Sequence, residues 1–290
     1  MRKWIMAVLC ALALTGCGAV VGAEQAPLQQ IAAQTALAKP LTYRVDSGVS
    51  ADAAQAEDGT PLVCYRFQLP RLQVLRADGS AIERPSTARE RKAAAVADTF
   101  NTHFEKWTAA EEFPSIVESA REDLAVCREW GSSWMGPYEM DLSCAVYQTE
   151  GLVSVAGTYY SYTGGAHPNT WHLSWNFDLE NGEFFGPEGL AADSVVFQQA
   201  MVEELVRQAG ETAAENGLVP EEMFWMDYES ILANWSSCAV FFDEGGMHVV
   251  FSPYELAAYG FGEQDFFLSY DWLRPYLSDH GRDVLGLTEE

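Results

Sequence analysis

Two histidines and an aspartate come closest to a chemical centre in this sequence of 290 residues. His167 and His172 are five residues apart, and Asp178 follows on the same predicted strand face as His172. Imidazole and carboxylate groups that meet at one point can bind a metal ion or transfer a proton. The alternative is that His167 packs within a loop while His172 lies on a strand surface. We expect this alternative, and therefore no metal and no cofactor.

The rest of the sequence lacks the common catalytic motifs. It contains no Gly-x-Ser-x-Gly, no Gly-x-x-x-x-Gly-Lys and no His-Glu-x-x-His. Carboxylates are so numerous that no pair stands out as a general acid and base. We therefore expect a protein without catalytic residues.

The loop around His167 has residue types that suit binding better than catalysis. Tyrosine gives a large contact area at a small cost in side-chain entropy, and the glycines expose the backbone. The glycines have another explanation, because a turn with positive φ requires them whether or not a ligand binds. The residues that we predict to contact a ligand are Tyr160, Tyr162, Gly164, Gly165, His167 and Asn169.

Two alternating segments flank this loop and would position it. Residues 152–160 and 171–179 place apolar side chains at every second position, which is the period of a half-buried strand. Glycine, proline and asparagine between them favour a turn, so the sequence predicts a β-hairpin. The second strand has an apolar face, which we expect in the core: Trp171, Leu173, Trp175 and Phe177. Its other face is polar: His172, Ser174, Asn176 and Asp178.

Further elements alternate irregularly along the chain. Amphipathic patterns predict helices at 86–107, after Pro114 and at 193–206, the first with a capping box at Thr87. Strands are predicted at 41–45, 63–69 and 266–270, loops at 51–59 and 213–220, and a second hairpin at 238–251. The hairpins imply antiparallel pairing. The predicted fold class is α+β, with a mixed, mainly antiparallel sheet and helices packed on one face.

The N-terminus has the features of a lipoprotein signal peptide. Two basic residues precede an apolar run over 4–14, which is too short to span a bilayer. The run ends in Leu-Thr-Gly-Cys17, which resembles a lipobox, so we predict a signal peptide at 1–16 and lipidation of Cys17. Ordinary secretion is the alternative. Residues 17–39 are predicted to be a lipidated tether, either disordered or marginally helical. The domain would then lie outside the cytoplasm, in the cell envelope, anchored to the membrane by its lipid.

The chain is strongly acidic. It has 42 acidic and 17 basic residues, a formal charge of -25. This charge disfavours nucleic acids and anionic lipid surfaces and favours cationic partners. Solubility alone is the alternative explanation.

Four cysteines remain besides Cys17 and the cysteine of the signal peptide. An exported chain with an even number of them is expected to form two disulfides, and three pairings are possible. Cys127 with Cys144 closes the shortest loop and costs the least chain entropy. We therefore predict this pair, which leaves Cys64 with Cys238.

Three motifs together resemble a known family. They are Tyr162–Asn169, Asn176–Gly182 and Phe251–Gly262, the last containing Pro-Tyr-Glu-Leu-Ala-x-Tyr-x-x-Gly. Their order and spacing make residues 176–280 similar to the domain of unknown function DUF3298. Residues 40–175 resemble DUF4163, which usually precedes it. The two segments form either separate domains or one compact unit.

The resemblance implies a role in the envelope. Such domains occur in the extracellular half of the anti-sigma factor RsiV, which binds lysozyme, and beside a peptidoglycan deacetylase domain. This sequence has neither the deacetylase motifs nor a second long apolar span. We expect a non-catalytic envelope lipoprotein that binds a lysozyme-like basic protein or a cell-wall glycan. The alternatives are a peptidoglycan-modifying enzyme or accessory with a site near His167 and His172, and a structural envelope protein.

Overall fold

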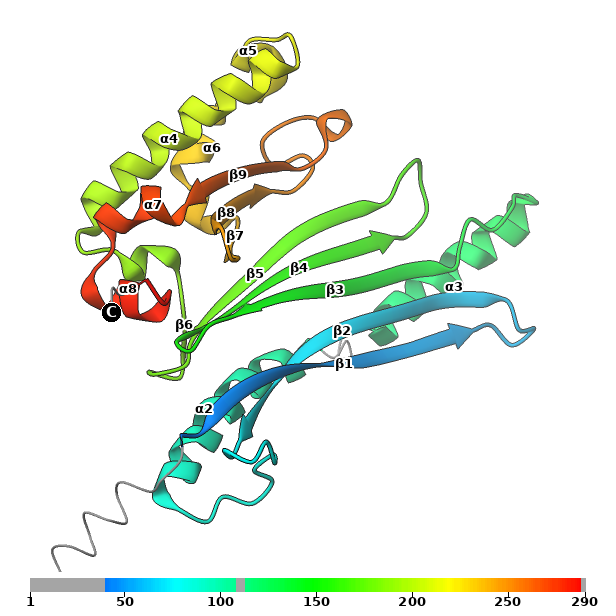
Figure 1. The fold of residues 1–290 in the computed structure, drawn as a ribbon. Helices are drawn as coiled ribbons and strands as arrows, with labels where there is room; N and C mark the ends of the chain where they lie inside the picture. The colour runs from blue at the N-terminus through cyan, green and yellow to red at the C-terminus, as the bar shows by residue number, and fades with distance from the viewer. Residues whose placement is uncertain (1–39, 108–112, 288–290) are drawn as a thin grey trace, which may run out of the picture. The chain divides into compact units, whose positions relative to one another are not determined.

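The computed structural model describes residues 40–107 and 113–287, and within them nine strands form two sheets (Figure 1). The first sheet has six strands in sequence order: β1 (Thr42–Gln55), β2 (Pro61–Leu75), β3 (Tyr138–Gln148), β4 (Leu152–Tyr162), β5 (Asn169–Asp178) and β6 (Glu183–Phe185). Neighbouring strands are antiparallel except β2 and β3. The predicted signal peptide, the lipidation site Cys17 and the predicted tether lie outside the described residues.

Two helices make the crossover that the parallel pair of strands requires. They are α2 (Ala88–Glu105) and α3 (Phe113–Trp130). α2 begins at the predicted capping box, in which the Thr87 hydroxyl accepts from the Glu90 N–H and the Glu90 carboxylate accepts from the Thr87 N–H. The start of this helix is therefore fixed by residues within its own first turn.

Both crossover helices pack on the predicted apolar face of the first sheet. Phe100 of α2 contacts Phe177, and Phe104 contacts Trp175, at ring-centroid distances of 5.3 and 5.1 Å. Leu173 of β5 packs against the neighbouring cluster that includes buried residues of α3. Burying these rings is the main favourable term for this half of the fold. The α+β class, with helices on one face of a mainly antiparallel sheet, is confirmed.

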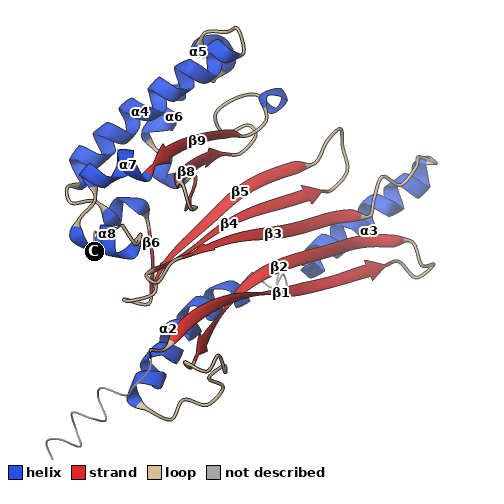
Figure 2. Cartoon of the chain, in the orientation of Figure 1, coloured by secondary structure: helices blue, strands red, loops and turns tan. Residues whose placement is uncertain are grey.

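The second sheet has three antiparallel strands with its own helices (Figure 2). Its strands are β7 (Ala239–Phe242), β8 (Gly246–Phe251) and β9 (Gln264–Ser269). The α-helices are α4 (Ser194–Glu215), α5 (Pro220–Met223), α6 (Tyr228–Ala233), α7 (Tyr270–Leu273) and α8 (Asp279–Val284). Short 3₁₀ turns are η1 (Pro187–Leu190), η2 (Trp235–Ser237), η3 (Tyr259–Phe261) and η4 (Arg274–Tyr276). Phe197, Met201 and Leu205 of α4 share one core with Val249 and Phe266 of the sheet.

Side chains from the polar face of β4 and β5 form hydrogen bonds with the backbone of β7, along the edge that does not pair with β8. The Val240 N–H donates to Ser174 Oγ at 2.8 Å, and Asn176 Nδ2 donates to the Val240 carbonyl at 2.8 Å. Farther along, the Phe242 N–H donates to Ser154 Oγ, which itself donates to Asn176 Oδ1. The second sheet is thus joined to the first through hydrogen bonds that complete a strand edge.

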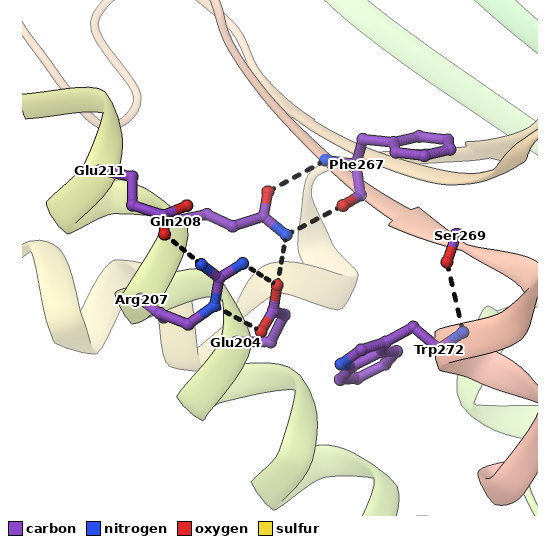
Figure 3. A network of polar contacts seen from close by, with 7 residues as sticks. All are labelled: Glu204, Arg207, Gln208, Glu211, Phe267, Ser269 and Trp272. Carbon is purple, nitrogen blue, oxygen red and sulfur yellow. Dashed lines mark hydrogen bonds and ion pairs between the residues drawn. The ribbon is translucent and has the colours of Figure 1, made fainter. Parts of the chain in front are cut away.

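Other strand edges are completed in the same way. Asn101 of α2 bonds both the N–H and the carbonyl of Leu72 on β2. Gln148 accepts from the Val45 N–H and donates to the Tyr43 carbonyl on β1. Figure 3 shows a third such amide. There, Gln208 of α4 bonds the N–H and the carbonyl of Phe267 on β9, beside Arg207, which is held between two glutamates. We call each such side chain an edge cap.

Several predicted boundaries were wrong. β1 runs on through residues 51–55, predicted as loop, because its backbone pairs with β2 along its length although its side chains are small and polar. α4 extends past residue 206, because Ala209 and Ala213 continue its buried face to Glu215. Residues 175 and 176, where the two family-like segments were expected to meet, both lie within β5. Separate domains and one compact unit were both left open, and the chain from Leu41 onward forms one compact unit.

The two predicted disulfides are not formed, and all four cysteines outside the N-terminal segment are free. Burial raises the pKa of Tyr138 to about 12, and Asp123 and Cys127 lie near enough to add to the rise. Cys144 is six residues farther along β3, and six strand residues span about 20 Å. The short loop between Cys127 and Cys144 in sequence therefore does not bring their thiols together.

The same distance separates the other predicted pair. Cys64 is level with Glu139 near the start of β3. Cys238 and Ser174 line the same cavity. Ser174 pairs with Ala156 of β4, which in turn pairs with Ala145 of β3. Glu139 and Ala145 are again six residues apart, or about 20 Å along the strand. Cys64 and Cys238 consequently lie too far apart for a disulfide.

None of the helices in the described ranges is both long enough and apolar enough to cross a membrane.

Replacing Asn176 with alanine tests the junction of the sheets. The substitution leaves the buried Val240 carbonyl without its donor and the Ser154 hydroxyl without its acceptor, so we expect a loss of about 2–4 kcal/mol in the free energy of unfolding, measured with urea. Asn169→Ala, on the exposed end of the same strand, should change it by less than about 0.5 kcal/mol. Equal effects of the two substitutions would contradict this role of the junction.

Candidate functional site

The loop between β4 and β5 is shaped by its two glycines. Gly164 and Gly165 have φ angles of +90° and +104°. A Cβ atom at either position would meet nothing within 4 Å, so the backbone conformation, and not lack of space, requires glycine there. The Tyr162 hydroxyl donates to the Gly165 carbonyl at 3.1 Å and holds the loop against the end of β4. These observations support the conformational explanation for both glycines.

The His167 ring is held between the loop and a distant segment of the chain. It stacks on Tyr259 with a centroid distance of 3.9 Å and an interplanar angle of 19°. Its Nδ1 lies 2.9 Å from the Pro168 carbonyl, which can only accept, so Nδ1 carries the proton. In the neutral ring Nε2 is then the acceptor, and the Tyr254 hydroxyl lies 3.3 Å from it. His167 is thus a packed and hydrogen-bonded loop residue.

Tyr254 is held in a conformation that non-glycine residues rarely adopt. Its φ is +75°, which costs a β-carbon residue on the order of 1 kcal/mol. The turn is fixed by the Ser252 N–H, which donates to Glu255 at 2.6 Å, and by Trp225 Nε1, which donates to the Tyr254 carbonyl. Tyr254 is 50% exposed. The fold therefore retains backbone strain at a residue that presents its ring to solvent.

His172 connects the same two parts of the chain. Its backbone N–H donates to Ser252 Oγ at 2.9 Å. Its Nε2 lies 2.6 Å from Glu263 Oε2, in a close contact that lacks good hydrogen-bond geometry. The segments Tyr162–Asn169 and Phe251–Gly262 thus contact each other at His167, and His172 of β5 contacts Ser252 of the second segment.

The possible metal or proton-transfer site is not assembled. Asp178 bonds His280 Nε2 at 2.9 Å, His172 contacts Glu263, and His167 contacts the two tyrosines. Among the described residues, no group of three His, Cys, Asp or Glu side chains is placed to hold a metal ion. The arrangement therefore offers no support for chemistry shared by His167, His172 and Asp178.

The predicted binding residues fall into two groups. Tyr160 and Tyr162 lie on the same face of β4, and burial raises the pKa of Tyr160, with Glu139, Tyr162 and Tyr259 near enough to contribute. Asn169 is exposed at the start of β5, paired with Ser161. We name the aromatic group the tyrosine cluster: Tyr160, Tyr162, His167, Tyr254 and Tyr259.

Two members of the tyrosine cluster, Tyr254 and Tyr259, were not predicted as site residues. The Phe251–Gly262 motif contains both and was used only to establish the resemblance. Its aromatic residues and terminal glycine could have marked this motif as part of a binding site. Nothing in the sequence, however, showed that it folds against the His167 loop.

A cavity of about 720 Å³ adjoins the tyrosine cluster. Its lining includes Trp107 of the α2–α3 connection, Tyr159 of β4, Trp171 of β5 and Glu255 of the Phe251–Gly262 segment. Volumes between about 300 and 1,000 Å³ are typical of small-molecule sites. The cavity lies where the hairpin, α2 and the second sheet meet.

A second polar cluster lies on β8 and β9. His248 Nδ1 is 3.0 Å from both carboxylate oxygens of Asp265, and Nε2 is 3.1 Å from Asp243. The hydrogen bond to Asp265 raises the pKa of His248, burial opposes the rise, and the net shift is upward. The ring stacks on Phe241 at 4.9 Å. This cluster resembles a stabilising ion pair, since no nucleophile contacts it among the described residues.

Comparison with solved structures relates the fold to others. A member of the DUF3298 family from Bacteroides fragilis NCTC 9343 aligns over 86% of this chain and 98% of its own, with a TM-score of 0.54 and 13% identity. The chain shares the fold of a DUF3298 family protein. A DUF3298 family protein from Pseudomonas aeruginosa PAO1 aligns over 84% of this chain and 98% of its own, with a TM-score of 0.49 and 16% identity. No protein-family model matches the sequence, and no curated protein does.

Alanine at Gly165 tests the explanation for the loop glycines. Because φ is +104° and the space is open, we expect Gly165→Ala to lower the free energy of unfolding by about 1–2 kcal/mol through strain alone. Gly210→Ala is the control, since Gly210 lies in α4 with open space and should gain about 0.5–1 kcal/mol. A neutral Gly165→Ala variant would mean that the loop relaxes freely.

The His248 cluster predicts a pH dependence. A histidine whose pKa is raised on folding stabilises the folded state below the unfolded pKa of about 6.5, and this stabilisation is lost as pH rises through the folded-state value. The difference in unfolding free energy between wild type and His248→Gln should therefore shrink as pH rises above about 6.5. Chemical denaturation across that range measures it, and a constant difference would contradict the ion-pair role.

Proposed function

We propose that this chain is a non-catalytic, ligand-binding lipoprotein of the cell envelope, and that its ligand is a cationic protein of the lysozyme-like kind. The observation that carries the proposal is the charge of the two stretches of sequence that contain the tyrosine cluster. Residues 129–206 contain no Lys or Arg, and residues 208–273 contain twelve acidic residues and no Lys or Arg. Every member of the tyrosine cluster lies in these two ranges.

Exposed rings and carboxylates together suit an arginine- or lysine-rich surface. Tyrosine faces attract guanidinium and ammonium groups, and nearby carboxylates add ion pairs. Outward-facing groups of both kinds occur over residues 252–263: Tyr254 as a whole residue is 50% exposed, and the Glu263 side chain is 56% exposed. A partner can therefore reach both kinds of group at one place, and electrostatic attraction would speed its approach.

Further support comes from the sequence. The apolar run that ends at Cys17 supports export and lipid attachment, which would place the domain where an extracellular muramidase is encountered. The resemblance to DUF4163 and to the extracellular half of RsiV supports a lysozyme-like partner. The enzymatic alternative near His167 and His172 gains nothing from the geometry, since these residues are engaged by different partners.

Salt-dependent capture tests the proposal. Binding of purified lysozyme to the purified protein, measured by calorimetry, should weaken at least about tenfold between about 0.05 M and about 0.5 M salt, because screening shortens the reach of the carboxylates. Tyr254→Ala should weaken binding by about tenfold at low salt if the ring is a central contact.

Two matched glutamates provide the control. Glu263 and Glu118 have nearly equal side-chain exposure, 56% and 58%, but Glu118 lies on α3. We expect Glu263→Gln to weaken lysozyme binding and Glu118→Gln to leave it unchanged. Absence of binding, an affinity indifferent to salt, or equal effects of the two glutamate variants would refute this function.

A further inference from the structure

We propose that the cavity of about 720 Å³ beside the tyrosine cluster is a saccharide-binding site. The cavity lies at the open edge of β5, between aromatic rings on one side of the strand and polar groups of the second sheet on the other. Nothing in the proposed capture of a cationic protein requires this cavity, so the two proposals stand independently.

The backbone groups of Ser174 point into this open edge. In an antiparallel strand the N–H and C=O of one residue point to the same side, and neighbouring residues alternate. The Leu179 N–H bonds Gly151 on the β4 side, whereas the His172 N–H leaves β4 and bonds Ser252. Even-numbered residues of β5 therefore direct their backbone groups away from β4, and Ser174 is one of them.

The edge at Ser174 differs from the capped edges elsewhere in the fold. β6 pairs with this edge of β5 from Asn176 onward, and at His172 the Ser252 hydroxyl accepts a hydrogen bond from the backbone N–H. Between these points no strand of the described ranges pairs with this side of β5, so the Ser174 N–H and C=O lack a partner strand. At Leu72 and Phe267 one amide side chain supplies both bonds, and at Val240 Ser174 and Asn176 supply one bond each. At Ser174 a cavity stands where such a side chain would be. A ligand in this cavity would find the Ser174 N–H as a donor and the Ser174 C=O as an acceptor, side by side.

The cavity walls are aromatic on one side and polar on the other. Tyr159 and Trp171 lie with their ring centroids 5.7 Å apart and 31° between planes, and Trp171 is 40% exposed. Trp107 faces the same space from the end of α2. Ser237 and Glu255 supply the polar groups on the other side, and Lys106 adds one beside Trp107 at the end of α2. A ligand that fits must present an apolar face to rings and polar groups around its rim.

A pyranose ring has this distribution of groups. Its C–H face can lie against Trp171, and its hydroxyls can both donate and accept, which the Ser174 N–H and C=O require together. An acyl chain would bury these backbone groups without hydrogen-bond partners, which is unfavourable. A small ion would leave the rings unused. The cavity volume lies within the range typical of ligand sites and accommodates more than one sugar unit.

The test uses soluble oligosaccharides as probes. The purified protein is titrated with chitotetraose, cellotetraose and maltotetraose while tryptophan fluorescence and heat are recorded. We expect saturable binding of at least one of them, with a change in tryptophan emission. Trp171→Ala should weaken that binding about tenfold or more, because a stacking ring is lost. Trp130→Ala is the matched control, since Trp130 is 79% exposed on α3 and does not line the cavity.

Three results would overturn the assignment. They are absence of saturable binding for all three sugars, an equal loss of affinity in Trp171→Ala and Trp130→Ala, and displacement of the sugar by decanoate, which would show an acyl-chain site. Because Trp171→Ala leaves Tyr254 and Glu263 in place, lysozyme capture by the same variant reports on the proposed function separately. Loss of sugar binding with normal salt-dependent capture would locate the effect in the cavity alone.

Discussion

Unpaired strand edges are the constraint on which the structure depends. A backbone N–H or C=O buried without a partner costs about as much as a lost hydrogen bond, so a sheet edge inside a fold must be completed by something. Here side-chain amides and hydroxyls complete it, most consequentially at β7, where Ser174 and Asn176 bond Val240 and Ser154 bonds Phe242. The two sheets are consequently joined by specific bonds and not only by apolar contact.

This junction accounts for the position of the site. β7 is anchored on the middle of β4 and β5, so the segment after β8 lies beside the end of the same hairpin. His172 then meets Ser252 and Glu263, and His167 meets Tyr254 and Tyr259. Residues almost 90 positions apart in the sequence form one surface because a strand edge is fixed between them. The open edge at Ser174 belongs to the same arrangement.

Sequence patterns predicted what depends on local periodicity. The alternation around His167 gave the hairpin, and the apolar face of Trp175 and Phe177 was placed correctly in the core. The polar face was identified as well, but alternation does not tell whether a polar face meets water or another sheet. Asn176 is 4% exposed, and only its partner on β7 explains why a polar residue is buried there.

Long-range geometry was beyond these patterns. The disulfide prediction weighed loop length alone, while the direction of β3 separates Cys127 from Cys144. The positive φ of Tyr254 depends on the turn held by Glu255 and on the bond from Trp225, neither of which spacing reveals. Three of the five members of the tyrosine cluster were therefore predicted, all from the hairpin, where neighbouring residues in sequence are also neighbours in space.

Amide hydrogen exchange at β7 tests the central claim most directly. If Ser174 and Ser154 complete the edge of β7, the Val240 and Phe242 amides should exchange slowly, on the scale of the Phe241 amide that faces β8. Fast exchange at Val240 and Phe242 beside a slow Phe241 amide would show an open edge and loosely joined sheets. The site built from the two segments would then lack the anchor on which this account depends.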